Sequence, residues 1–379
     1  MSSLMAKMKK ASTIENAALL SKSELFKNKE FIPLPVPMMN IAFSGKFDGG
    51  FSNGLIQLAG PSKHFKSNMG LVLAKAFQDK HPEGIILFYD SEFGSTEDYF
   101  KNAGIDIDRV LHLPFMNIEE LKFDLMQKLE SLDVKTDKIF IFVDSIGNSA
   151  SKKELEDAKN EKSVSDMTRA KMIKQVFRLV TPYLTQKKVP MVVINHTYQT
   201  QEMYSKTVVS GGTGIEYSSN TIFTIGKRQV KEGDTLAGFE FVLNTNKSRY
   251  IKERTAIPIT VTFSGGVDKW SGLLDVALAA GFVTKPKVGW FTRPSKDVDE
   301  KLWRKAATNC AEFWEPLLKD KEFCEAVESM FLLTSSLMFT LDDEEGGSVI
   351  KAEPVDPTDL LGLAVDEEFD PETGEIISL

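Results

Sequence analysis

Short runs of apolar residues, each ended by a glycine or a polar side chain, recur through the middle of the chain. Four of these runs are almost continuous over five or six residues. Continuous apolar runs of this length are typical of strands that are buried on both faces, as in a parallel sheet. We therefore predict four core strands, at Leu55–Gly60, Ile85–Tyr89, Lys138–Asp144 and Val189–Ile194.

Helical patterns separate these strands. An apolar-periodic segment begins at Met69, and further patterns cover Thr96–Ala103 and Glu119–Leu132. Asp166 has the side chain of a helix N-cap, and after it apolar residues return at intervals of three and four. This spacing predicts a helix with one buried face, formed by Ile173, Val176, Phe177, Val180 and Leu184.

Strands dominate the next part of the chain. We expect three of them, the first two joined by a hairpin at Gly233-Asp234. Strands that alternate with helices, followed by a β-rich end, indicate an α/β fold with a largely parallel central sheet. The three further strands are predicted at Thr221–Ile225, Phe239–Asn246 and Ile257–Phe263.

The segments around this core are less regular. Residues 1–30 are rich in lysine and are interpreted as one helical arm, whereas the prolines of 31–37 exclude a helix interior and favour an extended linker. Met38–Gly54 is interpreted as a glycine-punctuated lead-in to the first core strand. Two polar stretches, Ser151–Ser165 and 197–220, are expected to be long loops, which inside a compact domain are usually functional or disordered.

These patterns divide the chain into four parts. Beyond Gly281 the sequence predicts short helices that contain Trp and Lys, and beyond Asp342 it lacks any periodicity and is expected to be disordered. The parts are an N-terminal helical arm and proline-rich linker at 1–37, an α/β core at 38–281, a small C-terminal domain at 282–341 and an acidic tail at 342–379.

Charge is distributed unevenly between these parts. The net charge of the 379 residues is −8, but residues 342–379 alone carry −12, so the rest of the chain is mildly basic at +4. A basic body with an acidic tail indicates a nucleic-acid partner, although a tail that only improves solubility is the commoner case. No apolar run approaches the ~20 residues that span a bilayer, no signal peptide is visible, and two late cysteines favour a reducing cytoplasm.

The first core strand leads into a phosphate-binding motif. The strand ends at Gly60, a short loop closes with Lys66-Ser67, and a helix follows, which is the layout of a P-loop. Lys66 would contact the β- and γ-phosphates of ATP, and the Ser67 hydroxyl would bind Mg²⁺. The pattern expects glycine where this chain has Phe65, so an ordinary strand–turn–helix junction is the alternative. The predicted nucleotide-binding residues are Gly60, Pro61, Ser62, Lys63, His64, Phe65, Lys66, Ser67 and Asn68.

Polar side chains also follow the other three core strands. Asp144 is placed to hold Mg²⁺, Glu92 to orient or deprotonate the attacking water, and His196 to sense the γ-phosphate and order the following loop. Each has a structural alternative, namely a turn aspartate, a solvated loop glutamate and a core histidine. Together they carry more weight, because ligands of α/β sheets bind at the carboxyl ends of the strands. Tyr99 is placed either to stack on adenine or to fill the core.

Several cations are candidates for DNA or for catalysis between subunits. Lys247 and Arg249, at the end of a strand, are candidates to complete the ATP site of a neighbouring subunit, as an arginine finger does. The alternative is ordinary surface charge, and the acidic residues of 154–161 nearly cancel the lysines beside them. The DNA-binding candidates are Lys152, Lys153, Arg169, Arg178, Lys206, Gly211 and Gly212.

The ordered set of Gly60, Lys66-Ser67, Glu92, Asp144, Asn195-His196 and Lys247-x-Arg249 resembles the RecA family of DNA strand-exchange recombinases. The likeness is greatest to the branch of that family found in T-even-like phages, and it runs from about residue 36 to about residue 318. The phrases that carry it are Leu58-Ala-Gly-Pro-Ser-Lys, Phe88-Tyr-Asp-Ser-Glu-Phe-Gly94, Val164-Ser-Asp-Met-Thr-Arg-Ala-Lys171, Ile194-Asn-His-Thr, Gly226-Lys-Arg-Gln and Ser271-Gly-Leu-Leu-Asp275.

This resemblance implies a RecA-type ATPase core that assembles into a helical filament on single-stranded DNA, with ATP and Mg²⁺ between subunits. It implies that Glu92 is the catalytic glutamate, that His196 is the γ-phosphate sensor, and that Lys247 and Arg249 act on the neighbouring subunit's site. By the same resemblance, 148–165 and 197–216 are the first and second DNA-binding loops.

The expected function is ATP-dependent homologous pairing and strand exchange with a homologous duplex, in recombination, repair and recombination-dependent replication. A recombination mediator and a single-strand-binding protein are expected partners, and the host cytoplasm is the expected location if the chain is phage-encoded. A hexameric helicase of similar core fold and a binding module that uses ATP only as a switch are the alternatives.

Overall fold

In the computed structural model of the chain, residues 3–14, 17–23, 29–160, 168–199, 207–210, 213–296 and 301–333 are described. The predicted acidic tail, the N-cap Asp166 and the loop residues Lys206, Gly211 and Gly212 lie outside these ranges.

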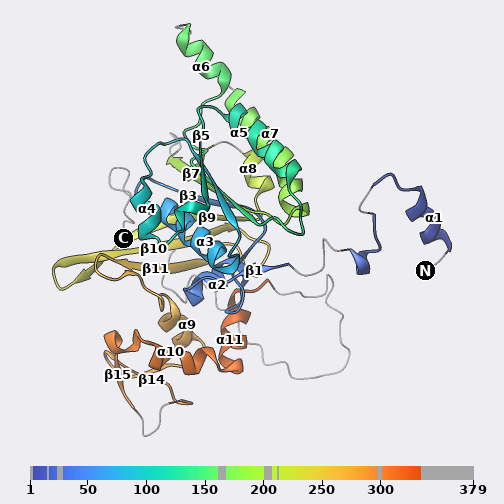
Figure 1. Cartoon of the computed structure of the whole chain (residues 1–379). Coiled ribbons are helices and arrows are strands. Elements are labelled where there is room, and N and C mark those ends of the chain that lie inside the picture. Colours follow the sequence, from blue (N-terminus) through green and yellow to red (C-terminus); the bar gives the residue numbers. More distant parts are fainter. Residues whose placement is uncertain are drawn as a thin grey trace.

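The core is a ten-stranded sheet whose central strands are parallel (Figure 1). Its order is β12-β11-β10-β9-β3-β7-β6-β4-β5, with β8 paired to β7 off this path, and the pairs from β9 to β5 are parallel. The fold class predicted from the sequence is therefore confirmed. The strands are β3 (Gly54–Gly60), β4 (Ile85–Asp90), β5 (Val110–Pro114), β6 (Ile139–Asp144), β7 (Pro190–Gln199), β8 (Thr207–Val209), β9 (Thr221–Glu232), β10 (Thr235–Lys247), β11 (Ala256–Thr262) and β12 (Gly266–Val267).

Helices cover both faces of this sheet, because successive side chains of each buried strand point to opposite faces. On β6, Phe140 and Phe142 join the apolar cluster under α3, whereas Ile141 and Val143 join the cluster under α5 and α7. The predicted apolar stripe on α7 is fully buried in the second cluster. The helices of the core are α2 (Pro37–Ser44), α3 (Lys66–Lys80), α4 (Glu97–Asn102), α5 (Ile118–Ser131), α7 (Thr168–Gln186) and α8 (Thr213–Ser218).

The N-terminal predictions were partly wrong. Instead of one helix over residues 1–30, the described part holds α1 (Ser3–Ala11), which lies apart from the core in Figure 1, and a 3₁₀ turn at Leu20–Lys22. The Ser12 hydroxyl accepts a hydrogen bond from the Ile14 backbone N–H. Such local bonds compete with continuation of a helix.

The predicted linker and lead-in are also packed parts of the core. Phe31–Ile32 forms the short strand β1, paired with β2 (Phe51–Ser52), and helix α2 begins at Pro37. Proline suits the first position of a helix, where no N–H partner is needed. The sequence did not reveal α2, because every one of its residues is buried and no polar face marks its period.

Both predicted loops contain regular structure. In the first, α6 (Lys152–Lys159) projects from the core (Figure 1) and is started by a capping box between Ser151 and Glu154. In the second, β7 continues to Gln199 and pairs with β8, and α8 follows. The prediction of unbroken loops was therefore wrong in the described residues.

The part beyond residue 270 combines helices with a small sheet that the sequence did not predict. Phe47 stacks on Phe323 with ring centroids 5.8 Å apart, and the Phe47 N–H donates to the Glu328 carboxylate at 3.0 Å, so α11 packs onto the core. Lysine and proline occupy the exposed strand β13, which therefore lacks an apolar alternation. The elements are α9 (Leu273–Ala279), β13 (Thr284–Lys287), β14 (Trp290–Thr292), β15 (Trp303–Arg304), a 3₁₀ helix at Lys305–Thr308, α10 (Ala311–Leu318) and α11 (Lys321–Phe331).

No helix within the described ranges is long and apolar enough to cross a membrane.

The contact between α3 and β6 provides a test of the fold. A Cβ on Gly70 of α3 would lie 2.4 Å from the ring of Phe142, which is buried beneath it. Alanine at this position improves helix propensity by about 1 kcal/mol, but the overlap should cost ~1–3 kcal/mol. We predict that Gly70→Ala lowers the thermal unfolding midpoint. A variant as stable as the wild type would contradict this close approach.

Candidate functional site

The register of the parallel strands brings the ends of four of them to one edge of the sheet. Gly60 at the end of β3 pairs with His196 of β7, and Asp90 at the end of β4 pairs with Asp144 of β6. The order β3-β7-β6-β4 places these two pairs next to each other. The predicted convergence of polar residues at one sheet edge is therefore confirmed.

The phosphate-binding loop has the expected layout. β3 ends at Gly60, where a Cβ would lie 3.0 Å from the Ile225 carbonyl oxygen, and α3 begins at Lys66. Phe65 precedes α3 with φ 58° and ψ 10°, in the left-handed region that the motif usually reserves for glycine. This conformation costs a non-glycine residue ~1–2 kcal/mol. The ring of Phe65 stacks on Phe241 at 4.8 Å, a contact of ~0.5–1.5 kcal/mol that offsets much of this strain.

Lys66 is buried within this loop. Its ammonium group donates a hydrogen bond to the Pro61 carbonyl oxygen. Burial lowers the pKa of Lys66 to about 8, although the carboxylates of Asp144 and Glu92 oppose the change. A buried ammonium in a low-dielectric site gains strongly from an anion, so this loop suits phosphate oxygens.

Asp144 and Ser67 fit a magnesium site. Burial raises the pKa of Asp144 to about 6, the carboxylates of Glu92 and Asp90 add to the effect, and the neighbouring Ser67 side chain opposes it. The Oδ1 atom of Asp144 is buried and has no hydrogen-bond partner among the residues that the structure describes. A buried carboxylate oxygen without a donor is where a cation would be stabilised most.

The described residues contain no cluster of three or more His, Cys, Asp or Glu side chains able to hold a metal. Mg²⁺ commonly binds through one or two protein ligands plus substrate phosphates and waters. This donor set therefore suits a magnesium ion that is shared with a nucleotide, with Ser67 and Asp144 as its protein ligands.

Glu92 is exposed, with 39% of its side chain accessible, and it is held by three donors. It accepts hydrogen bonds from the Ser145 hydroxyl at 2.7 Å and from Nε2 of His196 at 3.1 Å, and a longer one from Asn148 at 3.5 Å. The bond from His196 lowers the pKa of the Glu92 carboxyl, and Ser145 and Lys66 act in the same direction. Glu92 therefore stays ionised near neutral pH, as a residue that orients water must.

The loop that carries Glu92 is fixed from below by Asp90. The Oδ1 atom of the buried Asp90 accepts hydrogen bonds from the backbone N–H groups of Glu92 at 2.9 Å and of Phe93 at 2.8 Å. Phe93 has φ 55°, so the carboxylate stabilises a tight turn that lifts Glu92 over the strand ends. Asp90 was not predicted from the sequence, although an aspartate two residues before a candidate base was a usable signal.

His196 links this network to the segment after β7. The Ser210 N–H donates to the His196 carbonyl oxygen at 2.9 Å, and the buried Asn195 amide donates to the Ser210 carbonyl oxygen at 2.8 Å. A Cβ on Gly147 would lie 2.6 Å from the His196 ring. Glycine at 147 therefore makes room for this histidine, a role that was also missed.

Ser145 is the other missed contributor. It is fully buried, its hydroxyl donates to Glu92, and its backbone N–H donates to the Ser91 hydroxyl at 3.1 Å. Its position directly after Asp144 at a strand end was the available signal.

Tyr99 lies at the border of the site. Its hydroxyl donates to the Asn68 side chain, and burial, with a contribution from Asp144, raises its pKa to about 12. Its ring packs against the core beside Phe100. Stacking on adenine stays a prediction.

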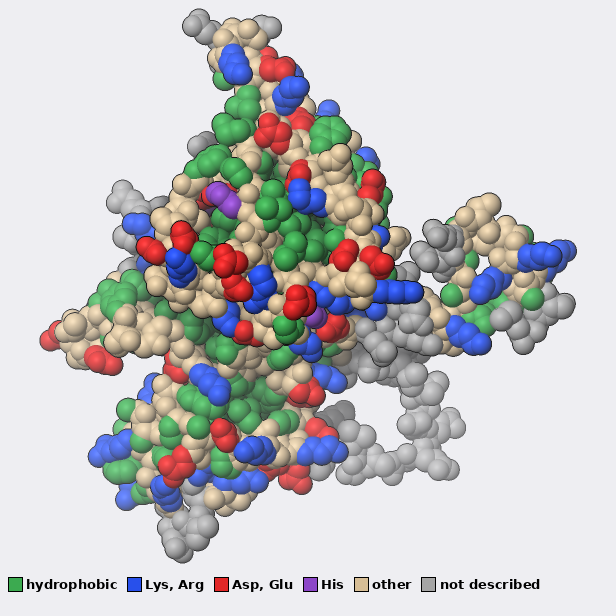
Figure 2. Space-filling model, viewed as in Figure 1, with side chains coloured by type: hydrophobic (Ala, Val, Ile, Leu, Met, Phe, Trp, Pro, Cys, Tyr) green, Lys and Arg blue, Asp and Glu red, His purple; other side chains and the backbone are tan. Residues whose placement is uncertain are grey.

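The predicted cations are dispersed over several elements. The Arg169 guanidinium donates to the backbone carbonyls of Ile146, Gly147 and Ser149, so it braces the segment beside Glu92. Lys152 and Lys153 lie on α6, and Arg178 is exposed on α7. In Figure 2 both signs of charge are interspersed over the visible face of the described residues. DNA binding by these residues stays a prediction.

Lys247 and Arg249 lie away from the sheet edge that carries Glu92, Asp144 and His196 in the same chain. Lys247 pairs with Ile222 of β9, which in turn pairs with Gln57, in the middle of β3. Its ammonium donates to the Glu216 carbonyl oxygen at 2.7 Å, at the end of α8, and Arg249 is exposed. The structure thus does not bring these two cations into the site of the same chain.

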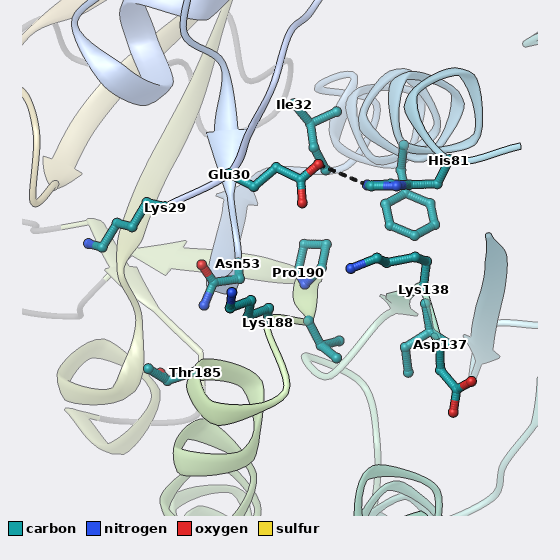
Figure 3. A pocket seen from close by; sticks show the side chains of 13 residues that line it. Lys29, Glu30, Ile32, Asn53, His81, Asp137, Lys138, Thr185, Lys188 and Pro190 are labelled. Atoms are coloured by element: carbon teal, nitrogen blue, oxygen red, sulfur yellow. Dashed lines mark ion pairs between the residues drawn. The ribbon is translucent and has the colours of Figure 1, made fainter. Parts of the chain in front are cut away.

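A separate cavity of about 50 Å³ lies at the opposite, amino-terminal ends of the strands (Figure 3). Asn53 precedes β3 there, Lys138 precedes β6, and Pro190 begins β7. Figure 3 shows the Glu30–His81 pair, 3.9 Å apart, at its rim. The cavity lies away from the phosphate-binding loop and is too small for a nucleotide.

Comparisons with known proteins agree with this geometry. The sequence model of the RecA N-terminal domain matches residues 27–267, and that of the C-terminal domain of the bacteriophage T4 recombination and repair protein matches residues 270–327. The recombination and repair protein of Enterobacteria phage T4 is 49% identical over 340 residues, covering 88% of this chain and 87% of that protein. Protein RecA of a Nocardioides species is 25% identical over 64% of this chain and 68% of that protein. Protein RecA of Mycoplasma mycoides is 24% identical over 66% of this chain and 72% of that protein.

The raised pKa of Asp144 gives a pH-dependent prediction for the protein without nucleotide or Mg²⁺. The ordinary pKa of an aspartate is 3.8, and that of Asp144 in the folded state is about 6. Between these two pH values the folded state binds more protons than the unfolded state, so Asp144 lowers the stability of the fold as pH rises. Above pH 6 the full cost is about 2–3 kcal/mol.

We therefore predict that Asp144→Asn has a higher unfolding midpoint than the wild type at pH 7.5. The difference should shrink as pH falls towards 4, measured by thermal unfolding with a chelator present. A difference that is constant with pH would contradict the buried, uncompensated carboxylate.

Proposed function

The chain belongs to the RecA family of recombination proteins, and we propose that it is a DNA-dependent ATPase that forms helical filaments on single-stranded DNA. In this proposal the filament catalyses homologous pairing and strand exchange with a homologous duplex. The resemblance predicted from the sequence motifs is confirmed. The relatives named above are recombination proteins and none is named as a helicase, so the helicase alternative gains no support from them.

One observation supports an ATPase most directly. The ionised carboxylate of Glu92 is held over the strand ends next to the buried ammonium of Lys66 and the carboxylate of Asp144. An acceptor close to a phosphate-binding loop is what in-line attack of water on a γ-phosphate requires.

Binding of ATP is assigned to the loop residues. Lys66 would leave the Pro61 carbonyl oxygen for the β- and γ-phosphates, and the backbone N–H groups at the start of α3 would donate to the same oxygens. Ser67 and Asp144 would hold Mg²⁺, which supplies neutralisation of phosphate charge. Burial of Lys66 strengthens its attraction to these anions, because the local dielectric is low.

Glu92 would then act as general base. In the structure its carboxylate is occupied by Ser145 and His196, which keep it ionised and fix its direction. Water placed between Glu92 and the γ-phosphate would lose a proton to this carboxylate as it attacks.

His196 connects the site to DNA. A γ-phosphate oxygen accepts hydrogen bonds as Glu92 does, so it can compete for the Nε2 donor of His196. Because the His196 backbone holds Ser210, a change in this side chain would reach the segment that follows β7, the proposed second DNA-binding loop. The state of the bound nucleotide would thereby set the affinity of this loop for single-stranded DNA.

Assembly of the filament completes the site. Lys247 and Arg249, which lie away from Glu92 in their own chain, are proposed to reach the nucleotide of the adjacent subunit and stabilise transition-state charge. A recombination mediator and a single-strand-binding protein are proposed as further partners.

Electron microscopy with single-stranded DNA and a non-hydrolysed ATP analogue tests the assembly. We expect helical filaments that require the analogue. Closed rings would favour a helicase, and the absence of any assembly would favour a binding module.

The catalytic assignment is tested with Glu92→Gln, which keeps the shape of the side chain and removes the base. Nucleotide should still bind and filaments should still form, while DNA-stimulated phosphate release should fall by ~10²-fold or more. Lys66→Ala, as a comparison, should lose nucleotide affinity as well. Normal turnover by the Gln variant would show that Glu92 is only a loop residue.

The acidic tail gives a further prediction. A segment of net charge −12 tethered to a body of +4 is expected to compete with DNA for basic groups. Deletion of 342–379 should tighten binding to a labelled oligonucleotide at low salt. The difference should shrink as salt rises, because exposed charges are screened beyond ~10 Å at 0.1 M. Equal fluorescence anisotropy titrations at every salt concentration would exclude this competition.

A further inference from the structure

Phe65 stands out among the residues of the phosphate-binding loop. The motif expects glycine at this position, directly before Lys66, and the backbone of Phe65 indeed has the left-handed conformation that glycine adopts freely. A bulky residue in that conformation is uncommon and is maintained where surrounding contacts determine it. The proposed function uses the backbone of this residue and leaves its ring without a role.

The ring is held by a strand on the other side of β9. Phe65 and Phe241 stack with centroids 4.8 Å apart and an interplanar angle of 18°. Phe241 is buried, and it lies on β10, which is separated from the loop-bearing strand β3 by β9. The stack therefore ties the loop to the antiparallel half of the sheet, a connection that the backbone itself does not make.

Further aromatic contacts extend from this pair across the outer strands. Phe239 lies 6.1 Å from Phe241, and Phe263, just beyond β11, lies 5.8 Å from Phe239. The ammonium of Lys227 on β9 sits 3.9 Å from the centroid of the Phe239 ring. Phe241 is therefore itself packed against Phe239, on the side-chain face that it shares with Phe65.

The supporting strand also leads to the cations discussed above. β10 runs without a break from Thr235 to Lys247, and Phe241 and Lys247 lie about 20 Å apart along it. Its pairing with β9 is regular from Gly238 to Thr245, and a register shift follows before Lys247.

We propose that Phe65 is a positioning residue, whose ring, stacked on Phe241, holds the phosphate-binding loop in its nucleotide-binding conformation and couples that loop to β10. The inference rests on the proposed function in that it assigns ATP to this loop. It adds that ATP affinity depends on strand β10, although Phe241 lies outside the motif.

The test compares equilibrium binding of a fluorescent ATP analogue in the presence of Mg²⁺ for the full chain and four variants. Phe241→Leu removes the stacking partner and keeps an apolar side chain. Phe65→Ala keeps a non-glycine residue in the left-handed conformation without its ring, and a third variant combines the two changes. Phe323→Leu is the matched control, because Phe323, which lies on α11 and outside the site, forms a similar stacked pair with Phe47.

We expect Phe241→Leu and Phe65→Ala each to weaken ATP binding about three- to tenfold. The double variant should be no weaker than Phe65→Ala alone, because both changes remove the same contact. Phe323→Leu should lower the unfolding midpoint and leave ATP affinity unchanged. Additive losses, or a Phe241→Leu variant that binds ATP as the wild type does, would overturn the proposal.

Phe65→Gly distinguishes a ring that positions the phosphate-binding loop from a ring that the loop only accommodates. It releases the backbone strain as well as the stack, so a flexible loop with weaker ATP binding is expected. Tighter binding than in the wild type would mean that the ring is only accommodated, and would overturn the proposal. If the wild type binds ATP but shows no DNA-stimulated hydrolysis, the proposed function fails while these binding measurements still decide the role of Phe65.

Discussion

The parallel register of β3, β7, β6 and β4 is the constraint on which the site depends. It sets Gly60 beside His196 and Asp90 beside Asp144, so that four chain segments far apart in sequence meet at one edge. The register is held by the apolar side chains beneath it, since a slip of one residue would turn every strand side chain to the other face. Packing of Phe140, Phe142 and their neighbours therefore determines where the chemistry can occur.

The charged side chains at this edge are arranged so that a bound nucleotide would stabilise them. Two carboxylates, Glu92 and Asp144, face one buried ammonium, Lys66. Burial raises the pKa of Asp144 to about 6 and lowers the pKa of Lys66 to about 8, so both values move towards neutral pH. Glu92 escapes this trend because His196 and Ser145 donate to it. Phosphates and Mg²⁺ would add charged partners to Lys66 and Asp144, while the direction of Glu92 is already fixed by its donors.

Much of this was predictable from sequence, and the exceptions have physical causes. Apolar runs revealed the buried strands, and the strand-end rule found Lys66, Glu92, Asp144 and His196. Helix α2 escaped because it is buried on all sides, and α6 because its capping box stands in a charged stretch without apolar period. Asp90, Ser145 and Gly147 act through distances that arise only on folding. The role of Phe65 required its partner Phe241, which lies 176 residues later in the chain.

In the proposed mechanism, His196 carries the state of the nucleotide site to the segment after β7. Hydrogen–deuterium exchange of the peptide that contains Ser210, whose N–H bonds the His196 carbonyl oxygen, measures this directly. A non-hydrolysed ATP analogue with Mg²⁺ should slow exchange there in the wild type and leave it unchanged in a His196→Ala variant that still binds the analogue. Equal slowing in both proteins would contradict the account.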